Sequence, residues 1–246
     1  ARCVRCTFQN NSAISTAPSA LSSAEGGALY IEALGGALIE LLDGRFSGNS
    51  AAGYLTASKV PVLSGIATSG GSLLLERLFV DFNGGETNPW TYDVRLEGWN
   101  AASRISMVDS QLTFGSSNGL IVATTDSVVL LGHLTIADYS SGYGAFLSAS
   151  GGQIALENSI VAFNWTDFNA TGSVLQTTNL VGGDPLFLNE AGGDYHLSAA
   201  SPAINAGTNG APSVRLADLD HHGRIAGSVS DIGCYEYHGL FADNFE

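Results

Sequence analysis

An eleven-residue pattern that recurs along the chain limits its fold more than any other sequence feature. Six segments fit the pattern without gaps, and their successive starts are 38, 34, 32, 24 and 25 residues apart. Positions one, three and eight are apolar in every copy: Ala1, Cys3 and Phe8; Ile39, Leu41 and Phe46; Leu73, Leu75 and Val80; Ile105, Met107 and Leu112; Val129, Leu131 and Ile136; Ile154, Leu156 and Val161. Residues two apart point to the same face of a strand, so each copy predicts strands with one buried face.

The fifth position of the pattern separates the two apolar stretches and is occupied by Asp43, Asp109 or Asn158 in three copies. Asp and Asn tolerate a left-handed bend, so a second short strand is expected to leave at an angle. Two strands, a bend and a return loop describe one coil of a solenoid, whose inner face is buried only when coils stack. We therefore predict an all-β right-handed parallel β-helix of about six to seven coils over residues 1–183, with its N-terminal coils missing.

The composition agrees with many strands joined by tight turns. Glycine accounts for 31 of the 246 residues, and charged residues for only 13%. Gly pairs such as Gly70-Gly71 and Gly151-Gly152 recur every few strands, and glycine destabilises helix interiors. A jelly roll or sandwich remains an alternative, because alternation does not distinguish parallel from antiparallel neighbours. The constant register of the six copies favours the solenoid.

Asparagine occupies position eleven in four copies, as Asn11, Asn49, Asn83 and Asn164. Equal positions of stacked coils lie at strand spacing, so these amides are expected to form a structural ladder. The ladder would skip the two copies in which this position is Gly115 or Tyr139.

The net charge of 9 − 23 = −14 excludes a nucleic-acid partner bound through its phosphates and disfavours anionic lipid. The chain has no apolar run of the roughly 18 residues that a membrane-spanning helix requires, so no membrane insertion is expected. The first residues lack the apolar region of a signal peptide, which suggests a processed or truncated chain. Cys3, Cys6 and Cys234 are expected to be disulfide-linked or buried structural cysteines.

From residue 179 onward the pattern changes and a series of short motifs follows in order. The motifs are Asp184–Phe187, Gly193–Leu197, Ser201–Gly207, Asp218–Asp220, Arg224 and Asp231–Glu236. This region resembles the C-terminal part of secreted bacterial right-handed parallel β-helix proteins of the pectate-lyase-like superfamily that carry a choice-of-anchor Q type module. The chain departs from that family at His221, where glycine is usual, and at Cys234, where alanine is usual. Residues 240–246 resemble the F-x-D-G-F-E endings of secreted gamma-proteobacterial proteins. The resemblance implies a secreted or cell-surface bacterial protein.

Residues 184–246 are expected to form a C-terminal cap and anchor-like tail packed on the last coil, because an open solenoid end exposes core and strand edges. Asp218, Asp220, Arg224 and Asp231 are expected to form ion pairs that hold this cap. An alternative is a Ca²⁺ ion held by Asp218, Asp220 and neighbouring carbonyl groups. No other cofactor is predicted.

The superfamily includes polysaccharide lyases and glycoside hydrolases, so both chemistries deserve a test against the residues. A lyase base would come from Lys59, Arg45 or Arg77, although surface ion pairs are the simpler interpretation of the arginines. A hydrolase needs paired carboxylates, but Asp81, Asp109 and Asp138 occupy positions nine, five and ten and do not stack. The five histidines, His133, His196, His221, His222 and His238, are expected in turns or at the surface, and His221-His222 is a poor metal pair because the two are adjacent. No catalytic residue is assigned.

Aromatic residues in the insertion of the third coil, Trp90, Tyr92 and Trp99, are candidates for stacking on sugars, with loop packing as the alternative. The first functional hypothesis is a non-catalytic extracellular or cell-surface structural or adhesive module that contacts glycans. The second is a polysaccharide-degrading enzyme. The third is a self-assembling subunit that associates through the open solenoid end at Ala1.

Overall fold

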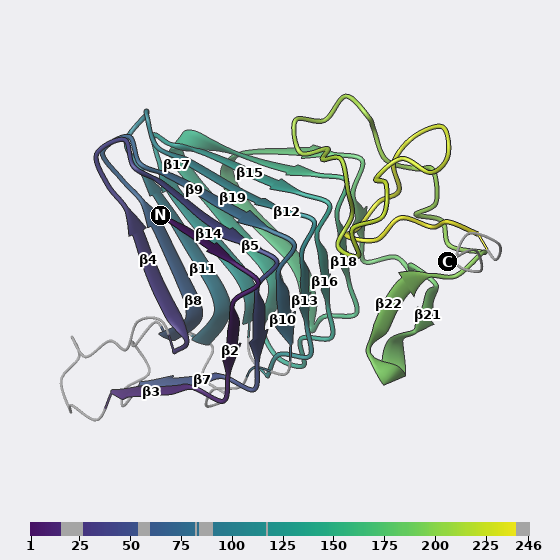
Figure 1. Cartoon of the computed structure of the whole chain (residues 1–246), viewed down its shortest axis with the longest axis horizontal. Coiled ribbons are helices and arrows are strands. Elements are labelled where there is room, and N and C mark those ends of the chain that lie inside the picture. The colour runs from purple at the N-terminus through teal and green to yellow at the C-terminus, as the bar shows by residue number, and fades with distance from the viewer. Residues whose placement is uncertain (16–26, 54–59, 82, 84–90, 117, 240–246) are drawn as a thin grey trace.

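The computed structural model describes residues 1–15, 27–53, 60–81, 83, 91–116 and 118–239. Within them the chain winds into a parallel β-helix (Figure 1). Trp90 and Lys59 lie outside the described residues. No described helix is long and apolar enough to cross a membrane.

Two walls of the solenoid belong to one continuous eleven-stranded sheet. One wall contains β4 (Leu29–Ala33), β8 (Val60–Ala67), β11 (Thr91–Trp99) and β14 (Asn118–Thr125), and the other contains β1 (Arg2–Val4), β5 (Leu38–Leu42), β9 (Ser72–Glu76), β12 (Arg104–Val108) and β15 (Val128–Gly132). The long strands β17 (Tyr143–Glu157) and β19 (Thr166–Thr177) run through both walls and join them.

A seven-stranded parallel sheet forms the third wall. Its strands are β2 (Thr7–Gln9), β6 (Arg45–Ser47), β10 (Phe79–Asp81), β13 (Gln111–Thr113), β16 (Thr135–Ala137), β18 (Ile160–Ala162) and β20 (Leu180–Val181). Seven strands in this wall correspond to seven coils of the described chain, within the predicted range. A further parallel pair, β3 (Ser12–Ser15) and β7 (Ser50–Gly53), extends the first two coils.

The strand register reproduces the sequence pattern. The position-one residues Ile39, Leu73, Ile105, Val129 and Ile154 are paired strand to strand. The position-eight residues do the same in the third wall. Both sets point inward and build one apolar core along the helix axis. The parallel β-helix prediction is therefore confirmed.

Two bends of the coil use the left-handed backbone region. The position-five residues have φ between 48° and 56° and are Arg5, Asp43, Arg77, Asp109, His133, Asn158 and Thr178. Among the described residues, position ten repeats this with φ between 54° and 64° at Asn10, Gly48, Phe114, Asp138 and Phe163, and in the last coil Gly182, at position nine, has a φ of 70°. Asp and Asn were the expected bend formers, but arginine, histidine and threonine adopt the same strained region. Stacking on the neighbouring coils therefore fixes the bend more strongly than residue type does.

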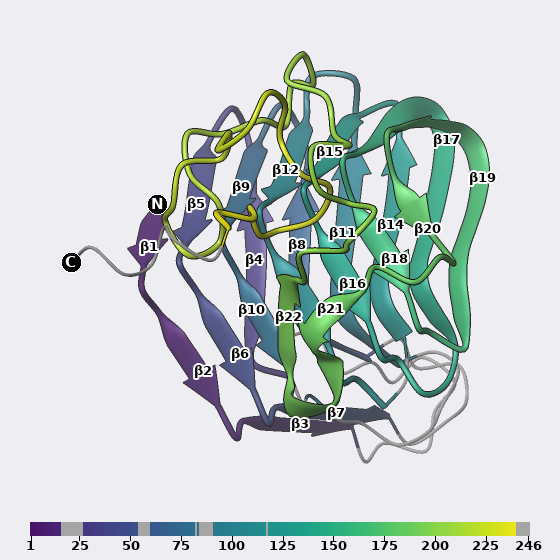
Figure 2. The same ribbon diagram turned by 90° about the vertical axis from the view of Figure 1, so that its right-hand side faces the viewer.

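The C-terminal segment, residues 184–239, does not cap the last coil. It forms a hairpin of β21 (Phe187–Asn189) and β22 (Asp194–Leu197), joined by the 3₁₀ turn η1 (Glu190–Gly192), and then runs in loops along the outside of the solenoid (Figures 1 and 2). It contacts residues of many coils, from Asp43 to Asn158. Gln176, which pairs with the core residue Leu156 and so takes an inward position of the last coil, is exposed. The segment thus covers the third wall, including Leu180 of the last coil, rather than the open end of the solenoid where the cap was expected.

The outer face of the third wall explains this position. Ala137 packs in a cluster with Tyr195 and Tyr235, and Ile160 packs in a second cluster with Leu197. Strands β13, β16 and β18 are consequently buried on both faces. Such strands need a covering layer, and the C-terminal segment supplies it.

A candidate metal centre in the C-terminal segment

One fully buried arginine joins the C-terminal segment to the solenoid. Arg224 donates to the carboxylate of Asp109, at the bend between β12 and β13, and to the carbonyl oxygens of Gly233 (3.1 Å) and Cys234 (2.9 Å). Both charged side chains are inaccessible to solvent. Burial raises the pKa of Asp109 to about 6, although the neighbouring guanidinium opposes that change.

Asp231, which was expected to form an ion pair, and the nearby Glu236 act mainly as acceptors for backbone N–H groups. Asp231 accepts from the amides of Asn205 and Tyr237, both at 2.6 Å. Glu236 accepts from the amides of Ala226 and Asp231 at 3.1 and 3.0 Å, and burial raises the pKa of Glu236 to about 7. These carboxylates satisfy backbone N–H groups in an irregular segment that forms few backbone–backbone hydrogen bonds.

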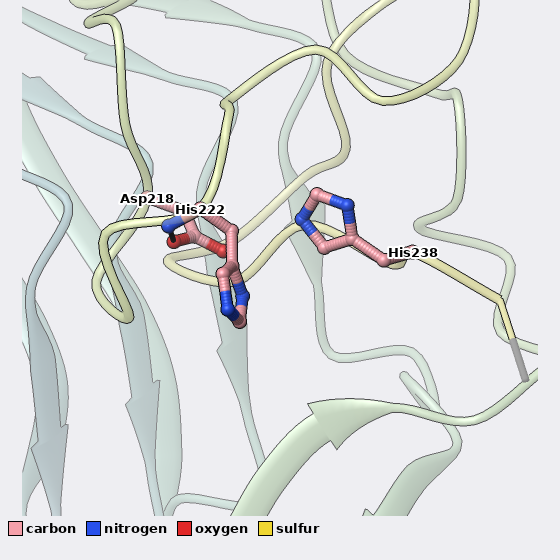
Figure 3. Close-up of side chains that lie close together, drawn as sticks. All are labelled: Asp218, His222 and His238. Atoms are coloured by element: carbon pink, nitrogen blue, oxygen red, sulfur yellow. Dashed lines mark hydrogen bonds between the residues drawn. The ribbon is translucent and has the colours of Figure 1, made fainter. Parts of the chain in front are cut away.

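A second set of polar groups brings together Asp218, His222 and His238 (Figure 3). Each residue contributes one ligand atom, and these atoms lie within 4.8 Å of one another. Asp218 is buried, His238 is half-buried and His222 is exposed. The two imidazole rings have their centroids 5.0 Å apart. Two nitrogen donors and one carboxylate form a set that holds divalent transition metals in proteins.

The neighbouring histidine takes a different role. His196 on β22 lies between two carboxylates, with Nδ1 2.6 Å from Asp194 and Nε2 2.6 Å from Asp220. These acceptors raise the pKa of His196 to about 9, chiefly through Asp220. Its ring also stacks on Tyr235 at 4.0 Å. Asp220, predicted to share a Ca²⁺ ion with Asp218, is thus paired with an imidazole.

A surface groove of about 550 Å³ lies over these residues. His196, Asp220, His222 and His238 contribute polar groups to its lining, and Leu188 and Tyr237 contribute apolar surface. Sequence reasoning did not join His222 to His238, because the fifteen residues between them carry no regular pattern. The only sequence signal was the high density of Asp and His between positions 218 and 222.

A carboxyl pair lies at the start of the segment. Glu190 lies beside Asp138, which accepts from the hydroxyl of Tyr195. Desolvation raises the pKa of Asp138, and desolvation together with Asp138 raises the pKa of Glu190. Sequence reasoning considered Asp138 only against other solenoid acids, so it missed a partner that comes from η1.

The predicted sugar-binding aromatics do not form one site. Tyr92 is the second residue of β11 and is 5% exposed, whereas Trp99 ends the strand and is 49% exposed. Seven residue steps along the strand separate them by about 23 Å. Tyr92 is therefore a packing residue, and Trp99 alone keeps an exposed ring.

Three of the four predicted ladder residues form one hydrogen-bonded column. The side-chain oxygen of Asn49 accepts from the Asn11 amide at 2.9 Å, and Asn49 donates in turn to Asn83 at 3.1 Å. Asn164 lies outside this column and instead accepts from the backbone N–H of Tyr139 at 3.1 Å.

The arginines considered for lyase chemistry are held in ion pairs. Arg45 lies 2.5 Å from Asp81, and Arg77 lies 2.6 Å from Asp43 and also contacts Glu76. Two cysteines, Cys3 and Cys6, form a disulfide, and Cys234 is a buried free thiol. Both observations agree with structural roles.

Residues 5–32, which include β2, β3 and part of β4, match the Chlamydia polymorphic membrane protein (Chlamydia_PMP) repeat, a β-helix-type repeat. Searches of curated proteins and of solved structures found no match. The likeness to a known family thus lies in the first coils and agrees with the fold.

Proposed function

We propose that the chain is a non-catalytic structural and adhesive β-helix module of a bacterial cell surface, secreted or surface-attached. The observation that carries the proposal is the match of the first coils to a repeat named for polymorphic membrane proteins. The resemblance of the C-terminal motifs to the choice-of-anchor Q type of the pectate-lyase-like superfamily supports the same location.

The wall formed by β4, β8, β11, β14, β17 and β19 supports an adhesive role. Its outward side chains alternate with the core residues, so Tyr30, Ile121 and Phe146 lie in register on its outer face. Tyr30 is 41% exposed, and the other two are half-buried. Trp99 has the same outward parity along β11. Aromatic and apolar groups on a rigid wall suit contact with sugar rings.

A glycan panel assayed for binding and for new reducing or unsaturated ends tests this proposal. We expect binding without turnover, and Trp99→Ala is expected to weaken binding at least tenfold. Trp165→Ala, which removes a still more exposed tryptophan just before β19, is the control and should bind as the parent does. Turnover by the parent chain, or equal losses in both variants, would contradict the proposal.

A further inference from the structure

Asp218 is a carboxylate whose position is fixed before any ligand arrives. Its Oδ1 accepts from the backbone N–H groups of Asp220 (3.0 Å) and His222 (2.8 Å), and its Oδ2 accepts from that of Glu236 (3.0 Å). A carboxylate has about four lone-pair sites, so one site on Oδ2 remains. Because Asp218 is only 1% exposed, its carboxylate is a rigidly positioned ligand group rather than a mobile surface acid.

The same hydrogen bonds place the two histidines. His222 is the residue whose amide binds Asp218, and His238 follows two residues after Glu236, whose amide binds it from the other side. The carboxylate therefore ties two chain segments into one cluster, and an imidazole comes from each (Figure 3). Hydrogen bonds that orient ligand groups are typical of metal sites in proteins.

His238 supplies an independent sign of a missing partner. Its Nε2 atom is shielded from solvent and has no hydrogen-bond partner among the described residues. An unsatisfied buried polar atom is unfavourable, and a bound metal ion would satisfy it.

We propose that Asp218, His222 and His238 bind one divalent transition-metal ion, with Zn²⁺ as the representative. Ca²⁺ prefers six to eight oxygen ligands, whereas two imidazoles and one carboxylate suit Zn²⁺ or Ni²⁺. Rotation of the exposed His222 side chain brings its ring nitrogen within coordination distance of the ion. The ion fastens residues 218–222 to the end of the described chain, and its fourth position faces the groove.

Equilibrium dialysis of tag-free, chelator-treated protein with Zn²⁺, and absorption of the Co²⁺ form, test this site. The parent chain should bind about one ion, and its thermal midpoint should rise on Zn²⁺ addition. His222→Ala and His238→Ala should each weaken binding at least tenfold and abolish the thermal shift. His221→Ala, which removes the adjacent histidine outside the cluster, is the matched control and should behave as the parent.

Circular dichroism of each metal-free variant confirms that it is folded before the dialysis is interpreted. The proposal is overturned if the parent binds no Zn²⁺ or Co²⁺ at micromolar concentration, or if both histidine variants keep the parent affinity. It is also overturned if His221→Ala loses as much affinity as they do, or if Ca²⁺ displaces Zn²⁺ from the site.

Discussion

Replacement of Arg224 by methionine removes the guanidinium group while keeping most of the side-chain volume. It leaves the carboxylate of Asp109 buried without its counter-charge, and two backbone carbonyl groups lose their donor. Loss of one partner from a buried ion pair is unfavourable by about 3–5 kcal/mol. We therefore expect Arg224→Met to lower the free energy of unfolding by about 4 kcal/mol at pH 8.

The loss should depend on pH in a defined direction. Burial already raises the pKa of Asp109 to about 6, and Arg224 acts to lower that pKa. Without the arginine the pKa of Asp109 rises further, so at pH 5 the carboxyl group is neutral and the penalty for burying it disappears. The destabilisation measured at pH 5 should therefore be clearly smaller than that at pH 8.

Urea unfolding followed by circular dichroism at both pH values measures these differences. Asp109→Asn is compatible with the left-handed φ of 50° at this bend, so the double variant with Arg224→Met completes a cycle with an expected coupling of about 2 kcal/mol. Arg215→Met removes a partly exposed arginine 3.8 Å from Glu76 and should change stability by less than about 1 kcal/mol. An Arg224→Met variant within about 0.5 kcal/mol of the parent at pH 8, or an additive cycle, would refute the reasoning.

Three further predictions concern the solenoid. The buried carboxyl group of Asp93 accepts from a tyrosine hydroxyl at 2.9 Å, and burial raises its pKa to about 8. The folded state therefore holds the proton more tightly than the unfolded state, and the free energy of unfolding should fall by up to about 5 kcal/mol as the pH rises from 4 to 8. In Asp93→Asn, urea titrations at pH 5 and pH 8 should lack that loss. Gly132→Ala places a Cβ atom 1.9 Å from a side chain of the C-terminal segment and should lower stability by about 1–3 kcal/mol, whereas Gly223→Ala meets no atom and should leave the thermal midpoint unchanged. Asn49→Ala removes the middle of the amide ladder and should lower stability by about 2 kcal/mol, against less than about 1 for Asn11→Ala at its exposed end; equal effects in calorimetry would contradict a ladder.

The solenoid core could be predicted because its apolar residues recur at the same positions of the eleven-residue pattern in successive coils. Ile39, Leu73 and Ile105 repeat in the sequence at the same frame position that they share in the sheet. The bends at Arg77 and His133 could not be predicted from residue type, because neighbouring coils impose their conformation.

The sequence contains a signal for the position of the C-terminal segment, but the prediction did not use it. Ile160, Val161 and Ala162 are apolar without alternation, and a strand of this kind is covered on both faces. The cluster at Asp218 had no comparable signal, because His238 reaches it through irregular loops whose path depends on buried carboxylates and on Arg224. Local spacing carries no information about such a path.

The C-terminal segment lies along the side of the solenoid and not over the open end of its last coil. Electron paramagnetic resonance distances between spin labels test it in a Cys234→Ala background with the Cys3–Cys6 disulfide intact. One pair of labels replaces His221 and Glu40, and a second pair replaces His221 and Leu175. His221 lies 3.5 Å from Asp43 in the second coil, and five strand steps separate β5 from β19, or about 24 Å along the axis. We predict that the 221–40 distance is clearly the shorter of the two, and a shorter 221–175 distance would contradict this position of the segment.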